Sequence, residues 1–317
     1  MPDKIGFIGL GTMGMPMAKN ILKKNGYLLA SVLNAEKKKK IQEAGADVAL
    51  DNCQVAKQCD VIFLSLLMPG IVEMVVAGEN GLLTHGKPGQ YIIDTSTISY
   101  GLSVQLSGLA KEKGITYIDA PISGGAGRAA DATLSIIVGA TKEEMGKAGI
   151  IPYLEAMGNS IHYAGKRGGG VGLKILNNML SKAILFADAE VILLAEHMGI
   201  PFETLYDVIM SSSSQNEILR IKKEHIASHS YSSSAKSYFP VIGTLKDLEL
   251  ARQLGEEKGI SSFCCNNVIQ WYRMASRRGY GDMDSSSIVE LLRDLEPVNS
   301  EGDFQSLYNP PDLSGGS

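Results

Sequence analysis

The chain has 317 residues, of which 44% are hydrophobic and 20% charged, and its formal net charge is −4. This length is enough for two domains, each with a core of its own. The lack of a basic excess argues against a nucleic-acid-binding protein, because such proteins neutralise phosphates with clustered lysine and arginine. We therefore expect a globular protein without a nucleic-acid partner.

The sequence gives no sign of a membrane span, a secretory leader or a metal site. The apolar run 183–195 is interrupted by Asp188 and Glu190, which makes it too short and too polar to cross a membrane. The start of the chain lacks the charged and apolar regions of a signal peptide. The four cysteines (53, 59, 264 and 265) and the five histidines show no metal-ligand spacing. A cytoplasmic protein without a metal fits these features.

Short apolar runs alternate with helical patterns over the first half of the chain. A helical pattern around Met17 to Leu22 closes near Gly26, and further helices are expected from about residue 35 to Gly45 and over 101–113. The expected strands are 4–8, 27–33, 61–66, 91–94, 116–119 and 134–138. This alternation predicts an α/β fold with a Rossmann-type, doubly wound and mostly parallel sheet.

Beyond Gly172 helical periodicity dominates and no strand is expected. The predicted helices are 174–198, 202–210, 215–225, 244–258, 261–277 and 285–295. We predict a Rossmann domain over 1–164, an all-α domain for substrate binding and oligomerisation over 165–296, and a flexible or partner-contacting tail over 297–317. A long interdomain helix would join the two domains. It is predicted to be largely buried from its apolar residues Leu173, Leu176, Ile184, Leu185, Val191, Leu194 and Ala195.

The first motif follows the first predicted strand and reads Gly9-Leu10-Gly11-Thr12-Met13-Gly14. Between a strand and a helix, Gly9 would make the tight turn, Gly11 would admit a pyrophosphate to the backbone, and Gly14 would let the helix pack closely. The helix N-terminus would offer amides and its dipole to phosphates. The pattern predicts a bound dinucleotide.

The residue expected to read the adenosine ribose is Asn34, which follows the second predicted strand. An acidic residue there would favour NAD, and a nearby arginine would favour NADP. Neither is present, and the lysines 37–40 are better read as a solvated helix face. The sequence leaves NAD and NADP open, with a slight preference for NAD because no guanidinium is in place.

Two further motifs end predicted strands, where ligands of open α/β sheets bind. In the segment 119–125, Ser123 and the amides of Gly124 and Gly125 could hold a carboxylate, although a plain strand-to-loop turn is an equal reading. In the segment 94–97, hydroxyl groups could meet the nicotinamide or the substrate. Capping of the following helix by Ser96, Thr97 or Ser99 is at least as good a reading.

Lys174 and Asn178 begin the predicted interdomain helix after a loop with four glycines in positions 168–172. Residues four apart lie on one helix face, so an ammonium and an amide would stand side by side. For a lone lysine the ordinary reading is a surface side chain. The position beside a nucleotide-binding half instead favours a functional lysine, with the glycines letting cofactor and substrate come close.

These motifs together resemble those of the β-hydroxyacid dehydrogenase family over residues 4–295. The shared segments are Gly-Leu-Gly-x-Met-Gly, Asp-x-Ser-Thr, Pro-x-Ser-Gly-Gly, Gly-x-x-x-Lys-x-x-x-Asn and Lys-Asp-Leu. The resemblance implies homodimers or homotetramers and a role for Lys174 as the general acid/base, with Asn178 as its partner. It also implies a substrate-carboxylate loop at Ser123, Gly124 and Gly125, and contacts to the nicotinamide from Thr97 and Lys246. Contacts on the adenosine side would come from Leu66, Leu67, Met68 and Pro69. Asp247 would orient Lys246 and the closing helix.

The chain departs from the family pattern at Arg128 and Ala132, where glycine is usual. Arg128 would contact a second anionic group of the substrate or lie on the loop surface.

The predicted reaction is NAD(P)-dependent hydride transfer between a small 3-hydroxy acid, such as 3-hydroxyisobutyrate, and its semialdehyde. Alternatives are a tartronate or succinic semialdehyde or glyoxylate reductase, or a dehydrogenase of a dicarboxylic hydroxy acid such as 2-(hydroxymethyl)glutarate. Two others are an imine reductase, against which Lys174 argues, and a non-catalytic dinucleotide-binding scaffold.

Overall fold

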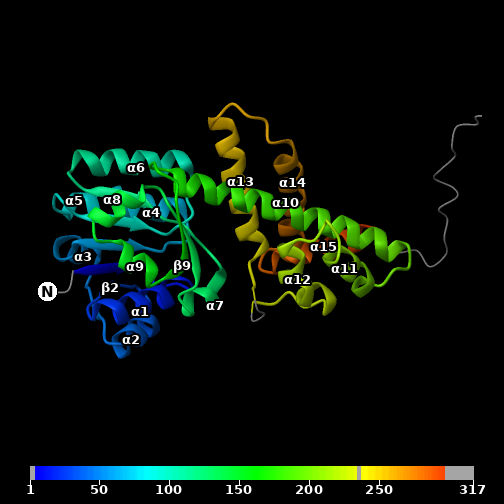
Figure 1. The fold of residues 1–317 in the computed structure, drawn as a ribbon, viewed down its shortest axis with the longest axis horizontal. Coiled ribbons are helices and arrows are strands. Elements are labelled where there is room, and N and C mark those ends of the chain that lie inside the picture. The colour runs from blue at the N-terminus through cyan, green and yellow to red at the C-terminus, as the bar shows by residue number, and fades with distance from the viewer. Residues whose placement is uncertain (1–3, 234–236, 297–317) are drawn as a thin grey trace, which may run out of the picture.

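The computed structural model describes residues 4–233 and 237–296, which form an α/β part and a helical part joined by one long helix (Figure 1). The α/β part is built on a six-stranded parallel sheet in the order β3-β2-β1-β4-β5-β6. Its strands are β1 (Ile5–Ile8), β2 (Leu29–Ser31), β3 (Asp47–Val48), β4 (Val61–Leu64), β5 (Tyr91–Asp94) and β6 (Thr116–Asp119). The central strands are apolar and buried along their whole length, because helices cover both faces of the sheet.

The helices of this sheet are α1 (Gly14–Asn25), α2 (Ala35–Glu43), α3 (Asn52–Gln58), α4 (Pro69–Ala77), α5 (Leu82–His85) and α6 (Tyr100–Glu112). The strand order reverses between β1 and β4, where the connections leave to opposite sides of the sheet. Ligands of doubly wound sheets bind in the crevice at this reversal. The loop after β1, which carries the glycine motif, lies there. The predicted Rossmann-type topology is confirmed.

A second, three-stranded sheet extends the α/β part, and the sequence did not reveal it. It consists of β7 (Ile122–Ser123), β8 (Leu134–Val138) and β9 (Gly158–Tyr163), with β7 antiparallel to β8. The short helices α7 (Gly125–Ala130), α8 (Lys142–Lys147) and α9 (Ile151–Glu155) accompany it. The strand expected at 134–138 therefore exists but does not belong to the parallel sheet, because β6 is the edge of that sheet.

The helical part begins with α10 (Gly169–His197), which runs from the α/β part through the length of the second part (Figure 1). Around it pack α11 (Phe202–Met210), α12 (Glu217–Ala227), α13 (Val241–Glu257), α14 (Phe263–Ala275), the π-helix η1 (Ser276–Tyr280), the 3-10 helix η2 (Ser285–Ser287) and α15 (Ile288–Leu295). Past Tyr163 the described residues form no strand, only one bridge between Pro240 and Asp284. The predicted tail 297–317 lies outside the described residues. None of the helices that are described is long and apolar enough to cross a membrane.

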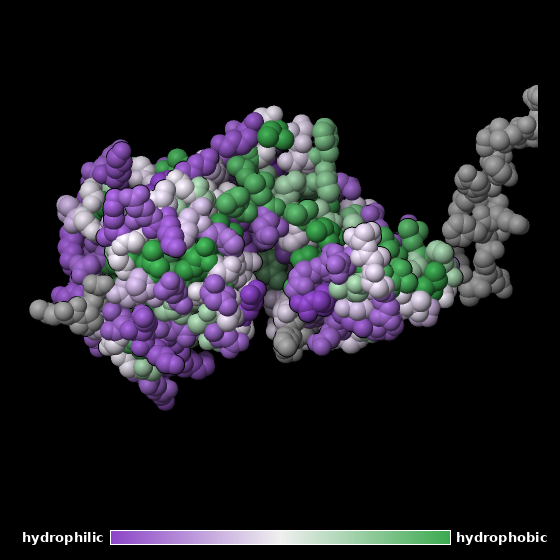
Figure 2. Space-filling view, in the orientation of Figure 1, coloured by the Kyte–Doolittle hydropathy of each residue, from purple (hydrophilic) through white to green (hydrophobic). Residues whose placement is uncertain are grey.

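One side of α10 is apolar and exposed, which corrects the prediction of a largely buried helix. Of the apolar residues that suggested burial, Leu185 and Ala195 are buried. Leu173, Leu176, Leu180, Val191, Leu194 and Met198 are between 42% and 73% exposed. Their spacings of three, four and eleven residues are all close to whole helical turns, which places them on one stripe. Figure 2 shows apolar surface over this part of the helical domain. A helix buried on one face and apolar on another has the pattern of an interface.

The N-terminus of α10 is fastened to the parallel sheet through Asp119 at the end of β6. The Asp119 carboxylate is fully buried and accepts hydrogen bonds from the backbone amides of Gly168 and Val171, both at 2.8 Å. A Cβ atom on Gly170 would lie 2.2 Å from the carbonyl oxygen of Ile137. The glycines here let the helix approach the backbone of the α/β part. This is a different role from the predicted approach of cofactor and substrate.

Candidate active site

The loop between β1 and α1 has the shape that a pyrophosphate requires. Gly9 has a φ of 95°, and a Cβ atom on it would lie 2.3 Å from the carbonyl oxygen of Ser65. A Cβ atom on Gly14 would lie 1.9 Å from the carbonyl oxygen of Gly9, so no other residue lets α1 start here. A Cβ atom on Gly11 would have no other atom within 4 Å. The open space at Gly11, together with uncapped amides at the start of α1, fits a dinucleotide phosphate.

Asn34 lies at the C-terminal side of β2 and caps α2, since its Oδ1 accepts from the amide of Lys37 at 3.0 Å. The side chain is exposed and can still turn to a ribose. Leu67 and Met68 follow β4, the other neighbour of β1, and are 77% and 47% exposed. Exposed apolar side chains at this edge of the sheet could pack against the flat face of an adenine ring.

The segment after β5 is mostly structural. The Thr95 hydroxyl donates to the carbonyl of Leu64 at 2.6 Å, and the Ser96 hydroxyl accepts from the amide of Leu66 at 2.9 Å. Ser99 caps α6, as in the alternative reading of this motif. Thr97 alone reaches the helical part, because its carbonyl oxygen accepts from Lys246 Nζ at 3.4 Å.

The loop after β6 turns at Gly124, with a φ of 138°, and opens α7 at Gly125. Gly124 and Gly125 are exposed and Ser123 is half-buried, so their polar groups remain accessible. The same loop begins at Asp119, which also holds the start of α10. Asp119 therefore ties the strand from which the candidate carboxylate loop leaves to the helix that carries Lys174.

Lys174 and Asn178 lie on the face of α10 that packs against α13, and each is 8% exposed. Asn178 donates its Nδ2 to Asp247 Oδ2 at 2.7 Å, while Asp247 Oδ1 lies 3.4 Å from Lys246 Nζ. Because a carboxylate only accepts, this contact fixes which end of the Asn178 amide faces α13. Asp247 thus orients Asn178 as well as Lys246, and the contact with Asn178 is one that the resemblance had not suggested.

Lys174 has no hydrogen bond and no ion pair within the described residues, although it is buried. Desolvation lowers the pKa of its ammonium from the ordinary value, Lys246 lowers it further, and the charge of Asp247 opposes this shift. A buried amine without a partner of its own is costly to a fold. Such groups gather at functional sites.

Comparisons with known proteins agree with this geometry. Residues 4–165 match the model of the NAD-binding domain of 6-phosphogluconate dehydrogenase, and residues 168–292 match the NAD-binding domain of NADP-dependent 3-hydroxyisobutyrate dehydrogenase. The chain is 34% identical to 2-(hydroxymethyl)glutarate dehydrogenase of Eubacterium barkeri, over 94% of this chain and 98% of that protein. It is 32% identical to mitochondrial 3-hydroxyisobutyrate dehydrogenase of Mus musculus, over 92% of this chain and 88% of that protein.

The chain belongs to the β-hydroxyacid dehydrogenase family. It is an NAD(P)-dependent oxidoreductase of small hydroxy acids. The solved structure of Mycobacterium tuberculosis 3-hydroxyisobutyrate dehydrogenase with L-serine superimposes with a TM-score of 0.83 at 26% identity, over 92% of this chain and 100% of that one. The two-domain fold predicted from the sequence is confirmed by this match.

Arg128, where the family pattern has glycine, is exposed on α7, and its side chain covers Gly124. The pKa of Glu217 at the start of α12 is lowered, first by a hydrogen bond from Arg220 and in smaller part by the charge of Arg128. The guanidinium of Arg128 therefore acts across the space between the two parts of this dehydrogenase. Figure 2 shows the surface hollowed between them.

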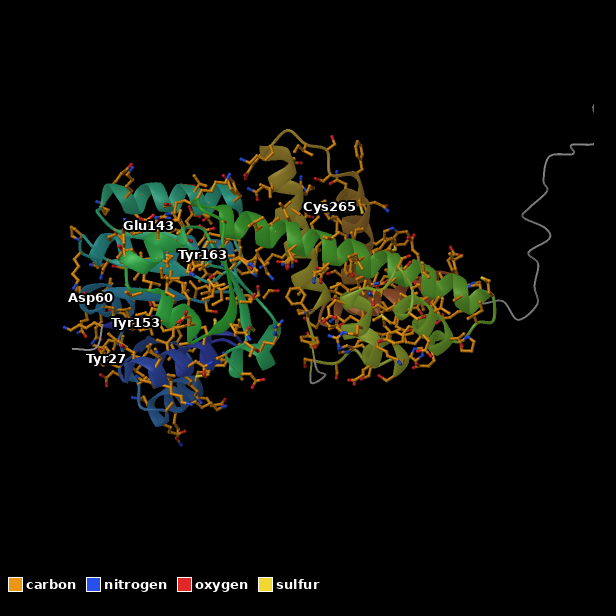
Figure 3. The ribbon with its side chains drawn as sticks, viewed as in Figure 1. Tyr27, Asp60, Glu143, Tyr153, Tyr163 and Cys265 are labelled. Atoms are coloured by element: carbon orange, nitrogen blue, oxygen red, sulfur yellow. The ribbon has the colours of Figure 1, made fainter. Side chains whose placement is uncertain are left out.

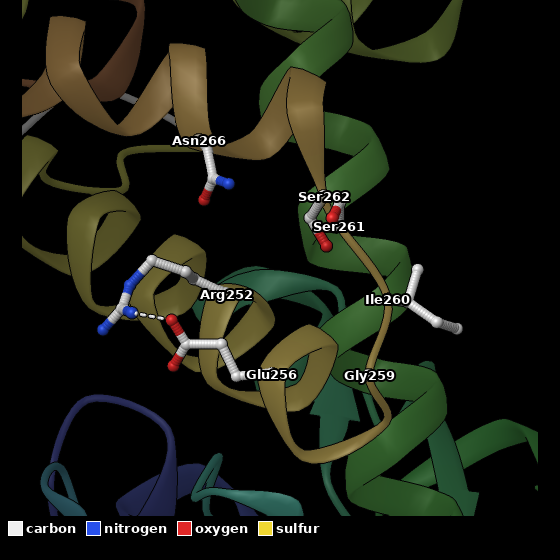
Figure 4. A pocket seen from close by; sticks show the side chains of 7 residues that line it. All are labelled: Arg252, Glu256, Gly259, Ile260, Ser261, Ser262 and Asn266. Atoms are coloured by element: carbon white, nitrogen blue, oxygen red, sulfur yellow. Dashed lines mark hydrogen bonds and ion pairs between the residues drawn. The ribbon is translucent and has the colours of Figure 1, made fainter.

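A separate surface cavity lies where α13 ends and α14 begins (Figure 4), and Lys174 is not among the residues that line it. Arg252 on its wall is held by ion pairs to Glu249 and Glu256. Its cation is already neutralised, so this cavity offers no free charge to a substrate. It is lined by Arg252, Glu256, Asn266 and the loop 259–262.

Sequence reasoning missed three features of the structure around α10. Asp119 was part of a motif, but its hydrogen bonds to α10 join residues 49 and 52 positions apart. Lys182 lies four residues after Asn178, and this spacing was a signal that could have been used. The ring of Phe239, 4.3 Å from Lys182 Nζ, comes from a loop whose position only the fold shows.

Proposed function

We propose that this protein oxidises a small 3-hydroxy acid to its semialdehyde, and reduces the semialdehyde in the reverse direction, with Lys174 as the general acid/base. The observation that carries the proposal is the buried, unpaired Lys174 on the same helix face as Asn178. Two types of substrate are candidates, and the first is a monocarboxylic acid of the 3-hydroxyisobutyrate type. The similarity to 2-(hydroxymethyl)glutarate dehydrogenase makes a dicarboxylic hydroxy acid the second.

A bound nicotinamide dinucleotide would supply the hydride acceptor or donor. It would be held by the loop from Gly9 to Gly14, with Leu66 to Pro69 on the adenosine side and Thr97 and Lys246 near the nicotinamide. We propose a slight preference for NAD, supported by the absence of an arginine in the segment from Ser31 to Glu43.

The chain's own groups would divide the remaining tasks. Ser123 and the amides of Gly124 and Gly125 would bind the substrate carboxylate. Neutral Lys174 would take the proton of the substrate hydroxyl during oxidation, and its ammonium would return the proton during reduction. Asn178 would position the substrate oxygen by donating the second hydrogen of its Nδ2, since the first is donated to Asp247. Because that amide is neutral, it would not compete for the proton.

A spectrophotometric screen tests the proposal. In the direction of oxidation, NAD+ and NADP+ are each assayed with 3-hydroxyisobutyrate, L-serine and 2-(hydroxymethyl)glutarate. In the direction of reduction, NADH and NADPH are each assayed with glyoxylate, tartronate semialdehyde and succinic semialdehyde. Turnover of one or more of these compounds is expected. A protein that binds dinucleotide but turns over none of them would instead support the non-catalytic scaffold.

The pH dependence of kcat should report the ionisation of Lys174. Oxidation needs the neutral amine, so its kcat is expected to fall as the pH drops below the pKa of Lys174. Reduction needs the ammonium, so its kcat should fall as the pH rises above that pKa. The inflection should lie below 10.5 because burial lowers the pKa. Lys182 also titrates in this region, with a pKa of about 8; the inflection should therefore persist in Lys182→Met. An inflection at or above the ordinary lysine value contradicts the assignment.

We propose that the protein forms a homodimer or homotetramer through the exposed apolar stripe of α10. A second copy of the chain would cover this stripe, because monomeric proteins rarely expose a continuous apolar surface of this length to solvent. Leu180, 62% exposed in one chain, lies on the stripe. Leu180→Glu is expected to lower the molar mass measured by sedimentation equilibrium. Glu224→Lys, a charge reversal at an exposed position of α12, is the control. An unchanged mass in Leu180→Glu removes the stripe as the interface.

We also propose a reducing, cytoplasmic setting. All four cysteines are free thiols. Cys265, on α14 (Figure 3), is buried, and burial raises the pKa of its thiol to about 11. Such a thiol reacts slowly because little thiolate forms at neutral pH.

A further inference from the structure

Lys182 continues the row of polar residues that Lys174 and Asn178 begin on α10. The three residues are four positions apart, so they share one face of the helix. Lys182 lies about 12 Å along the helix axis from Lys174. Helical side chains lean toward the N-terminus of their helix, which directs the Lys182 side chain toward Asn178.

Helix α13 and the residues just before it lie opposite this row of side chains. Asn178 faces Asp247, and Lys182 faces Phe239, whose ring centroid is 4.3 Å from Nζ. The ring packs on Gly243, where a Cβ atom would come within 3.1 Å of it. Gly243 lies one turn before Asp247 on α13. Lys182 and Phe239 therefore extend the Asn178–Asp247 contact by one helical turn, away from Lys174.

The backbone that carries the Phe239 ring is held in place by a buried ion pair. Phe239 donates its backbone amide to Asp284 Oδ2 at 2.8 Å, and Lys222 Nζ donates to the same oxygen at 2.7 Å. Asp284 is fully buried and also accepts two hydrogen bonds from Ser286. Asp284 is therefore fully engaged, and Lys222 is neutralised by it.

Lys182 has no carboxylate of its own. Within the described residues its ammonium has no hydrogen bond or ion pair, only the contact with the Phe239 ring. Around the row, the ammonium groups of Lys174, Lys182, Lys222 and Lys246 face the two carboxylates of Asp247 and Asp284. When all are ionised, two positive charges remain uncompensated. One substrate carboxylate would balance only one of them.

We propose that Lys182 binds a second carboxylate of the substrate, so that the enzyme prefers dicarboxylic hydroxy acids over monocarboxylic ones. This rests on the proposed function and names its substrate class. The distal carboxylate would form a charge-assisted hydrogen bond with Nζ beside the Phe239 ring. Burial, Lys222 and Lys174 lower the pKa of Lys182 to about 8, against Asp247 and Asp284; most of the amine is therefore charged at neutral pH.

Two substrates that differ only in the distal group test the proposal: 2-(hydroxymethyl)glutarate and 2-(hydroxymethyl)pentanoate, in which a methyl group replaces the second carboxylate. The wild-type protein should favour the diacid in kcat/KM. Lys182→Met should lose about 10- to 10²-fold on the diacid and little on the monoacid. Lys182→Arg, which keeps the cation, should restore part of the loss. An equal loss on both substrates, or no preference in the wild type, overturns the proposal.

Two variants separate Lys182 from other cations. Lys223 on α12 also lies over a ring, 4.1 Å from the centroid of Tyr206, but it is paired with Glu203 at 2.7 Å. Lys223→Met should leave the preference for the diacid unchanged. Arg128→Ala is assayed on the same pair of substrates. A loss confined to the diacid in Arg128→Ala, with none in Lys182→Met, would assign the second anion to Arg128 and overturn the proposal for Lys182.

A binding measurement keeps this inference apart from the proposed function. Glutarate and pentanoate, which cannot be oxidised at a carbinol, are titrated into the protein with its dinucleotide bound, using calorimetry. Tighter binding of glutarate that is lost in Lys182→Met supports the inference even if no hydroxy acid is turned over. Equal affinities of the two acids overturn it even if turnover is found.

Discussion

Replacing Lys174 with methionine is expected to lower kcat by about 10³-fold or more, within the range that general acid–base groups contribute. Methionine has a similar length and no titratable proton, so the substrate hydroxyl would lose its proton acceptor. The fold should tolerate the change, because Lys174 is buried without an ion pair and its removal leaves no buried partner charge alone. Turnover and dinucleotide affinity are measured side by side.

Dinucleotide affinity should change little in this variant. The loop from Gly9 to Gly14 would bind the dinucleotide at the crevice of the parallel sheet, and no backbone hydrogen bond within the described residues joins this loop to Lys174. Lys223→Met is again the matched control, with kcat expected within twofold of the wild type, on the order of the effect of a surface substitution. Turnover of Lys174→Met within tenfold of the parent protein would rule Lys174 out as the general acid/base.

Local patterns were sufficient to predict most of the fold. The buried parallel strands β1, β4, β5 and β6 were expected within two residues of their bounds, because each is a continuous apolar run between turn residues. The helices of the second part followed from their periodicity. By contrast, β3, β7 and β9 were missed. The strands β3 and β7 have only two residues each, and β9 is half-exposed, so none of the three carries a clear hydrophobic period.

The contacts of the candidate site were harder to predict, because they join residues of different helices and strands that are far apart in the sequence. The expected Asp247–Lys246 pair is present, but the shorter contact of Asp247 is with Asn178, 69 residues away. Likewise, the apolar spacing of α10 could not distinguish a face buried within the chain from a face left for a second copy. Leu185 and Leu194 follow the same helical periodicity, yet they are 1% and 62% exposed. Hydrophobic periodicity gives the faces of a helix, and only tertiary packing decides what covers each face.

The approach of α10 to the α/β part should be the structural feature on which the site depends most. A Cβ atom on Gly170 would lie 2.2 Å from the carbonyl oxygen of Ile137 and 2.9 Å from that of Asp119, and both are backbone atoms that cannot swing aside. Gly170→Ala must therefore displace the helix. We expect a loss of about 2–3 kcal/mol in the free energy of unfolding, the cost of overpacking a rigid contact, measured by denaturant titration.

Activity should fall together with stability in this variant. Lys174 lies one turn after Gly170, so a displaced helix carries it with the shift, and a misplacement of about 1 Å in a catalytic group costs about 10²-fold in rate. Gly172→Ala is the matched control, because its Cβ atom would come no closer than 3.4 Å to the ring of Tyr100. In that helical position alanine should be neutral or stabilising by up to about 1 kcal/mol. Equal stability and activity in the two variants would show that the backbone contact at Gly170 does not set the position of Lys174.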